Sequence, residues 1–163
     1  MAIDKIADVL GISKYVVSKY GDMRWFDLHK YLFFINAYSM AMYREKLIKY
    51  PFIAWAGGPA LICLYKLHKG NFNECNMKWF KDKKCSVVPK FWKEHIDNVV
   101  KVYIGSISEG DYFYYENDKD CEDGRTIVTP WRKARRGLGI LDRGHNKIKD
   151  SDIILYYGKN VVL

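Results

Sequence analysis

The feature that most constrains the fold is a segment, residues 28–43, that is apolar on every side of a helix. Asp27 is expected to cap its start. Its apolar side chains are Leu28, Tyr31, Leu32, Phe33, Phe34, Ile35, Ala37, Tyr38, Met40 and Ala41. A helix that is apolar all round is normally buried all round. The sequence therefore predicts a central helix with the rest of the chain packed around it.

Two further segments have the periodicity of amphipathic helices. Residues 6–20 form the first, with Gly21 as its stop and with Gly11 expected to kink or break it. Pro89 opens the second, which Gly105 is expected to close. The apolar stripe of this second helix consists of Trp92, Ile96, Val99, Val100 and Tyr103.

The remaining segments are shorter. Residues 47–55 contain β-forming side chains around a proline and predict a short edge strand or irregular hairpin. Pro59 is expected to be the first residue of a short helix. Residues 106–115 predict another helix, opened by a capping box, and two more helices are expected to begin after Thr129 and Asp150.

Length and composition favour one globular domain. The chain has 163 residues, within the usual range for a single domain. We expect residues 1–163 to form one compact, mainly α-helical domain with a central buried helix and a short β-hairpin or edge strand. Its four cysteines lack CxxC spacing, which favours a reducing compartment and hence the cytoplasm. The richest apolar stretch, residues 31–43, is shorter than the ~20 residues that a bilayer requires, so no membrane association is expected.

A net charge of +8 favours acidic partners, either a nucleic acid or an acidic protein surface. Basic side chains are concentrated immediately after Trp131. The candidate partner-binding residues are therefore Arg132, Lys133, Arg135 and Arg136. Arginine and tryptophan often dominate interfaces. The alternative is a solvated charge run that only keeps the protein soluble.

The motifs of known chemistry are missing from the sequence. The four histidines are scattered singly, and Cys75 and Cys85 match none of the usual zinc spacings. No GxSxG, P-loop or GxGxxG pattern occurs. We therefore expect no enzymatic activity, no metal and no cofactor.

The first helical segment has a second interpretation, as a DNA-binding helix-turn-helix. Ala7, Gly11 and Val17 have the offsets of its packing residue, turn and docking residue. A single amphipathic helix with a glycine in its middle explains the same residues. In the DNA-binding alternative, the side chains that face phosphates or bases are Ser13, Lys14, Ser18 and Lys19.

Residues 28–43, LHKYLFFINAYSMAMY, form an aromatic helical segment, and residues 54–65, AWAGGPALICLY, follow it with an AW–GP motif. In these motifs the chain resembles the Panacea family, the SocA-like or GepA-like antitoxin domain. Residues 130–135, PWRKAR, resemble its PW segment, and residues 148–157 its closing helix. Residues 12–21 look like its first helix, an interpretation that competes with the helix-turn-helix.

The resemblance implies an antitoxin that neutralises a toxin encoded nearby by direct binding. Family members are paired with unrelated toxins, some occur in prophages, and at least one delivers its toxin to a protease. The alternatives are a DNA-binding repressor, which could regulate its own operon, and a protease adaptor. The family-motif residues, expected to be mainly structural, are Lys30, Trp55, Gly58, Pro59, Tyr65, Pro130 and Trp131.

Overall fold

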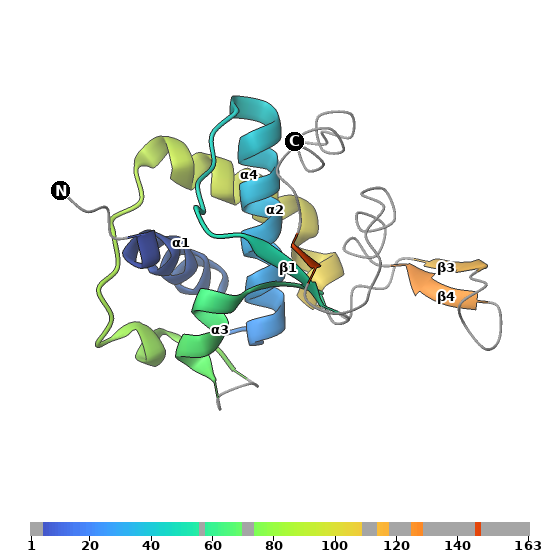
Figure 1. Cartoon of the computed structure of the whole chain (residues 1–163), viewed down its shortest axis with the longest axis horizontal. Helices are drawn as coiled ribbons and strands as arrows, with labels where there is room; N and C mark the ends of the chain where they lie inside the picture. Colours follow the sequence, from blue (N-terminus) through green and yellow to red (C-terminus); the bar gives the residue numbers. More distant parts are fainter. Residues whose placement is uncertain are drawn as a thin grey trace.

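The computed structural model describes residues 5–55, 58–69, 74–108, 114–117, 125–128 and 146–147. Four helices and two small sheets occur in these residues (Figure 1). The expected fold class, mainly α-helical with a central buried helix and a short hairpin, is confirmed. In chain order the elements are α1 (Lys5–Tyr20), α2 (Trp25–Tyr43), β1 (Phe52–Trp55), β2 (Gly58–Leu61), α3 (Ile62–His68), the 3-10 helix η1 (Met77–Phe80), α4 (Lys90–Ser108), β3 (Tyr114–Asn117), β4 (Arg125–Val128) and β5 (Asn146–Lys147).

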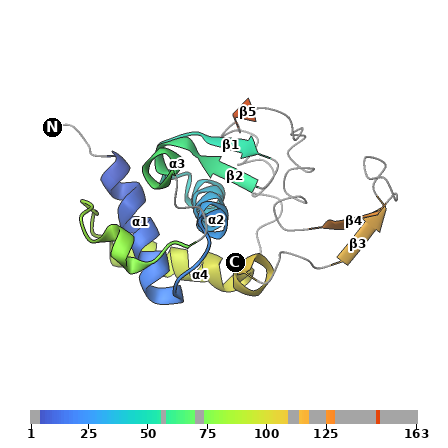
Figure 2. The same cartoon turned by 90° about the horizontal axis from the view of Figure 1, so that it is seen from below.

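Helix α2 is the centre of the molecule. Figure 2 shows it between α1, α4 and the β1–β2 hairpin. Its side chains from Leu28 to Met40 are all buried, including four aromatic rings. The capping prediction was wrong. The helix begins at Trp25, and Asp27 lies in its first turn, where its carboxylate accepts hydrogen bonds from the Arg24 guanidinium at 2.8 and 3.0 Å.

The chain that leaves α2 is held against it. Arg44 adopts the left-handed conformation (φ 56°, ψ 28°) and ends the helix. The buried Asn36 Oδ1 then accepts a hydrogen bond of 2.9 Å from the Ile48 amide, and Ser39 Oγ donates to the Glu45 carbonyl at 2.8 Å. These side chains in the middle of α2 therefore fix the path of residues 45–48.

Helix α1 is continuous through Gly11, so the predicted kink or break there is wrong. Gly11 is buried, and a Cβ at this position would overlap the carbonyl oxygen of Ser86. The Ser86 amide also donates to the Ala7 carbonyl at 2.9 Å. The missing side chain thus lets a second segment approach the helix closely. Gly21, with φ 91°, follows the end of the helix as predicted.

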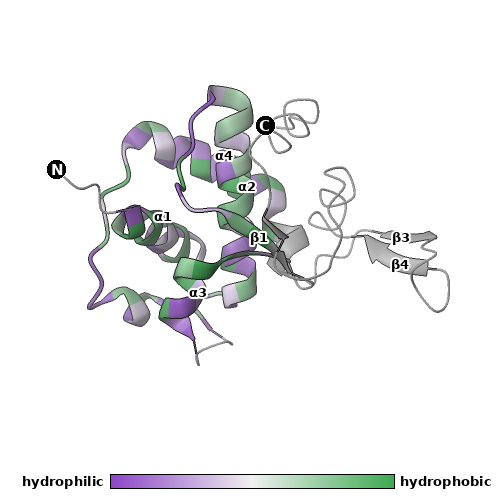
Figure 3. Ribbon diagram, in the orientation of Figure 1, coloured by the Kyte–Doolittle hydropathy of each residue, from purple (hydrophilic) through white to green (hydrophobic). Residues whose placement is uncertain are grey.

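The β1–β2 hairpin agrees with the hairpin alternative of the prediction, and two other predictions are corrected. Strand β1 is the middle strand of a sheet ordered β2–β1–β5, so it is not an edge strand. Pro59 lies in β2 opposite Ala54, and α3 begins three residues later at Ile62. Strand β2 is an outer strand of this sheet. Proline, which has no backbone N–H to donate, is tolerated on an outer strand because one side of that strand has no partner to receive a hydrogen bond. Figure 3 shows that the start of α3 is hydrophobic.

Helix α4 has the predicted stripe, with Ile96, Val99 and Val100 buried. Its end was predicted wrongly, because the helix continues through Gly105 to Ser108. One glycine costs only about 1 kcal/mol in a helix and does not by itself end one. Of the segment predicted as the next helix, residues 106–108 complete α4, residues 109–113 lie outside the described residues, and Tyr114 and Tyr115 begin strand β3, which pairs antiparallel with β4. Its tyrosines favour a strand. The helices expected after residues 129 and 150 lie outside the described residues.

Candidate protein-binding surface

An apolar hollow of about 580 Å³ lies between the start of α1, strand β1 and helix α3. We call it the α3 hollow. It is lined by Ile6, Tyr50, Pro51, Ile53, Ile62, Cys63, Lys66 and Leu67. Lys66 is the one charged residue among these lining residues. Leu67 is 44% exposed although it is apolar. The hollow therefore offers an apolar surface with a single cation beside it.

A second hollow, of about 300 Å³, is called the α4 hollow. It is lined by Asp8, Ile12, Glu45, Lys46, Leu47, Lys49, Ser86, Val87, Val88, Pro89 and Trp92. Lys49 lines this hollow, and the next residue, Tyr50, lines the α3 hollow. On α1, Asp8 lines the α4 hollow and Ile6 lines the α3 hollow. Both hollows thus draw lining residues from α1 and from residues 45–53.

Three aromatic rings, two exposed and one half-buried, lie at the α4 hollow, which Trp92 lines. Tyr43 at the end of α2 contacts Phe91 and Trp92 at the start of α4, edge to face, with ring centroids 5.1 and 5.6 Å apart. Phe91 is 52% exposed, and Val87, in the segment that leads into α4, is 89% exposed. Exposed apolar groups gathered in one place are typical of protein-interaction sites. We call the rings of Tyr43, Phe91 and Trp92 the aromatic cluster.

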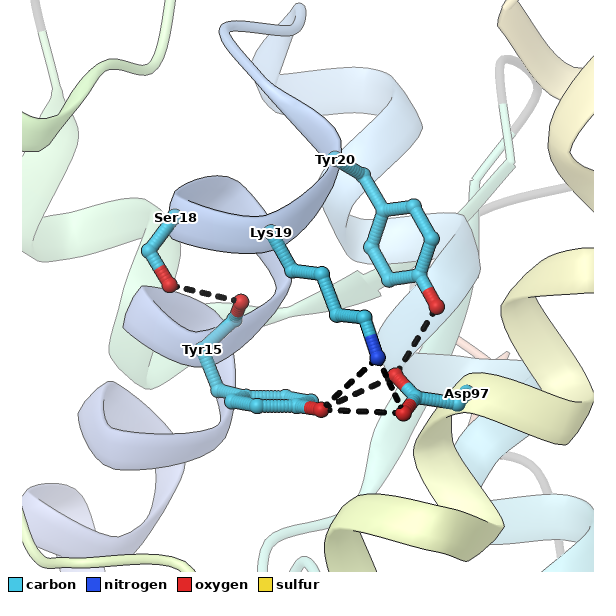
Figure 4. Close-up of polar contacts among 5 residues, drawn as sticks. All are labelled: Tyr15, Ser18, Lys19, Tyr20 and Asp97. Carbon is cyan, nitrogen blue, oxygen red and sulfur yellow. Dashed lines mark hydrogen bonds and ion pairs between the residues drawn. The ribbon is translucent and has the colours of Figure 1, made fainter.

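A polar cluster joins α1 to α4 (Figure 4). Asp97 accepts hydrogen bonds from the Tyr15 hydroxyl at 3.0 Å and the Tyr20 hydroxyl at 2.8 Å, and it forms an ion pair with Lys19. Burial alone would raise the pKa of Asp97, but the hydrogen bonds from Lys19, Tyr20 and Tyr15 lower it. Burial and the hydrogen bond to Asp97 raise the pKa of Tyr20. The carboxylate thus holds two helices together.

Two buried histidines join α2 to α3. The Nε2 atoms of His29 and His68 are 3.0 Å apart, and His29 Nδ1 accepts a hydrogen bond from the Leu61 amide at 3.0 Å. The Trp25 ring stacks on the His68 ring with a centroid distance of 4.0 Å. Burial lowers the pKa of His29 to about 3 and that of His68 to about 4. Both rings are therefore neutral near pH 7.

The helix-turn-helix interpretation is wrong for the local structure, because residues 5–20 form one helix without a turn. Ser13 is fully buried and donates to the Val9 carbonyl at 2.7 Å, so it does not face a ligand. Lys14 and Ser18 are exposed. Lys19 is paired with Asp97.

The family-motif residues lie in the central elements where the structure describes them. Lys30 is buried on α2. Trp55 and Gly58 are opposite each other in the β1–β2 register, and Pro59 is buried in β2. On α3, the half-buried Tyr65 packs edge to face against His68. The residues that lie outside the described part are Pro130, Trp131, Arg132, Lys133, Arg135 and Arg136.

The described ranges contain neither a metal-binding cluster nor a membrane-spanning helix. No group of three or more His, Cys, Asp or Glu side chains there could hold a metal ion. No helix within these ranges has both the length and the apolar character that crossing a bilayer requires. The cysteines that the structure describes, Cys63, Cys75 and Cys85, are free thiols.

Comparisons of the chain with family models, curated proteins and solved structures found no match. The resemblance to the Panacea domain therefore stays a prediction.

Sequence reasoning missed the hollows and the aromatic cluster. One signal was available, because Phe91 follows Lys90 and lies off the stripe that begins at Trp92. An aromatic residue outside the buried stripe of an amphipathic helix is expected on the surface. The hollows had no such signal, since their linings come from segments distant in the sequence.

Proposed function

We propose that the protein is an antitoxin that neutralises a toxin encoded nearby through direct protein–protein contact. The observations that carry this proposal are the apolar α3 hollow and the aromatic cluster, whose Trp92 lines the α4 hollow. The motif resemblance supplies the kind of partner. The surface supplies a physical reason for binding a protein, because aromatic anchors beside pockets carry much of the energy of interfaces.

Net charge supports the same proposal. The chain carries +8, and the basic cluster Arg132, Lys133, Arg135 and Arg136 remains the candidate for capturing an acidic partner. A long-range positive field speeds the encounter with a negatively charged protein. Apolar contacts would then hold the complex after the encounter. Charge would thus speed the capture of the partner, and apolar contacts would slow its dissociation.

The test is to express the adjacent open reading frame alone and together with this gene. We expect the neighbour to stop growth when it is expressed alone and growth to recover when both are expressed. Purified wild-type protein should also bind the purified neighbour in calorimetry. A neighbour that is harmless alone, or that remains toxic in the presence of this protein, contradicts the proposal.

A further inference from the structure

We infer that the α3 hollow receives an apolar segment of the partner protein that carries a carboxylate facing Lys66. This inference rests on the proposed function, since it takes the occupant to be part of a protein partner. It adds the chemistry of the segment that binds.

The lining is suited to an apolar group. Ile6, Ile53 and Ile62 line it from three different elements, α1, β1 and α3. Its volume of about 580 Å³ lies within the roughly 300–1,000 Å³ of pockets that take ligands. Leu67 extends the apolar lining and is 44% exposed. Covering these side chains would remove apolar area from water, which is the main source of favourable free energy in association.

The charges around the hollow select an acidic occupant. Lys66 is exposed and makes no ion pair with any residue that the structure describes. Lys5 and Lys49, also exposed, directly precede the lining residues Ile6 and Tyr50. A carboxylate beside Lys66 would therefore meet only positive charge among the described lining residues. Its partial burial in the complex would strengthen that attraction.

A second copy of this chain is a poorer occupant. Two copies would bring together two molecules of net charge +8, and like charges at an interface are unfavourable. An acidic partner gains from the same field. The observations therefore favour a different, acidic protein over self-association.

Cys63 provides a direct reporter of occupancy because it lines the hollow, whereas Cys85 lies outside the lining and serves as an internal reference. Labelling of each thiol by N-ethylmaleimide would be followed by mass spectrometry of the full-length protein's peptides. The first probe is 8-anilinonaphthalene-1-sulfonate, an apolar anion that imitates an apolar group with an acid. We expect it to slow labelling of Cys63 at least fivefold and to leave labelling of Cys85 unchanged.

The charge requirement is tested with Lys66→Glu, and the apolar requirement with Leu67→Ser. Both positions are exposed, and thermal unfolding would verify that each variant folds. Protection of Cys63 by the probe should be lost in Lys66→Glu and weakened in Leu67→Ser. Burial raises the pKa of Cys63 and the charge of Lys66 partly offsets this, so rates with and without probe are compared within each variant. Equal protection in wild type and Lys66→Glu, or none in wild type, overturns the inference.

The second probe is the purified neighbour-encoded protein. We expect it to protect Cys63 and to bind Lys66→Glu at least tenfold more weakly than wild type. If it binds but neither protects Cys63 nor distinguishes the variants, the inference fails and the proposed function stands. If it does not bind while the sulfonate still protects Cys63, the proposed function fails and the preference of the hollow for apolar anions stands. Labelling of Cys63 that slows as protein concentration rises would show a second copy in the hollow and overturn the inference.

Discussion

His29 on α2 and His68 on α3 share one hydrogen bond between their Nε2 atoms, 3.0 Å apart. The Leu61 amide donates to Nδ1 of His29, so the neutral His29 ring carries its proton on Nε2 and donates it to His68. The hydrogen-bond network assigns these proton positions. A second proton on His29 would face the Leu61 N–H, so the arrangement requires both rings to be neutral.

The first prediction concerns acid stability. An unfolded histidine has a pKa of about 6.5, whereas burial lowers that of His29 to about 3 and that of His68 to about 4 in the folded protein. The unfolded state therefore binds more protons below pH 6.5. The free energy of unfolding should fall as pH drops from about 6.5 toward 4, by up to about 1.4 kcal/mol per pH unit for each ring. Urea unfolding at several pH values measures this slope.

The variant His68→Gln tests the assignment, because its side-chain carbonyl can still accept the proton of His29 while it does not titrate. Between pH 6.5 and 4, the free energy of unfolding of this variant should depend less steeply on pH, by the contribution of about one titrating proton. An unchanged slope in this variant would show that the histidine pair does not cause the acid sensitivity.

The second prediction concerns Gly11. In an isolated helix, replacing glycine by alanine stabilises by about 1 kcal/mol. Here the added methyl group would overlap the Ser86 carbonyl oxygen, and overpacking of this kind costs about 1–3 kcal/mol. We expect Gly11→Ala to lower the midpoint of urea unfolding. The control is Ser18→Ala, at an exposed position of the same helix, which should change stability little. A stabilised Gly11→Ala protein would contradict the close approach of the two segments.

The third prediction concerns Asp97. Replacing it with alanine removes the common acceptor of two tyrosine hydroxyls and of Lys19. Because water can reach part of the cluster, we expect a loss of about 1–3 kcal/mol. Lys19→Ala should cost less, since its side chain is 44% exposed and exposed ion pairs contribute little. Chemical unfolding of both variants gives the comparison, and equal losses would contradict it.

The same cluster changes how DNA binding should be tested. Lys19→Glu would place a second carboxylate beside Asp97 and disturb the helix contact, so lost DNA binding would not identify a phosphate contact. Lys14 is exposed on the same helix, and Lys14→Glu is the cleaner variant. A gel-shift assay of it on the upstream promoter, at two salt concentrations, separates specific from merely electrostatic binding.

The fourth prediction concerns the aromatic cluster. Phe91→Ser should weaken binding of the neighbour-encoded protein at least tenfold while thermal stability changes little, since the ring is already 52% exposed. The matched control is Phe26→Ser at the start of α2, a phenylalanine of nearly equal exposure away from both hollows. Titration calorimetry measures the two affinities. Equal weakening by both substitutions would assign the loss to something other than this surface.

The fifth prediction concerns the basic cluster. The double variant Arg135→Glu and Arg136→Glu should fold normally but associate much more slowly with its partner, most clearly at low salt. Stopped-flow association rates at two ionic strengths test this. An unchanged rate would remove the cluster from the encounter and leave binding to the apolar surface alone.

The sequence predicts the helices better than their ends. Residues 28–43, with apolar side chains on every side of a helix, identified the buried helix, and the stripe from Trp92 identified α4, because each pattern reports the environment of one element. The predictions at Gly11 and Gly105 were wrong, because the effect of a glycine in a helix depends on what packs against it. Ser86, which packs against Gly11, is 75 residues away in the sequence. The prediction that Pro59 begins a helix was wrong for a similar reason, because its place on an outer strand depends on pairing with β1. The hollows unite segments distant in sequence, so no single pattern could predict them.

The hydrogen bond from the Ile48 amide to Asn36 has a consequence for recognition. It fixes a wall of the α4 hollow to the buried helix α2 before any partner arrives. A loop that is already ordered loses little conformational entropy on association. Binding at this wall should therefore resemble the meeting of two preformed surfaces rather than the folding of a loop onto its target.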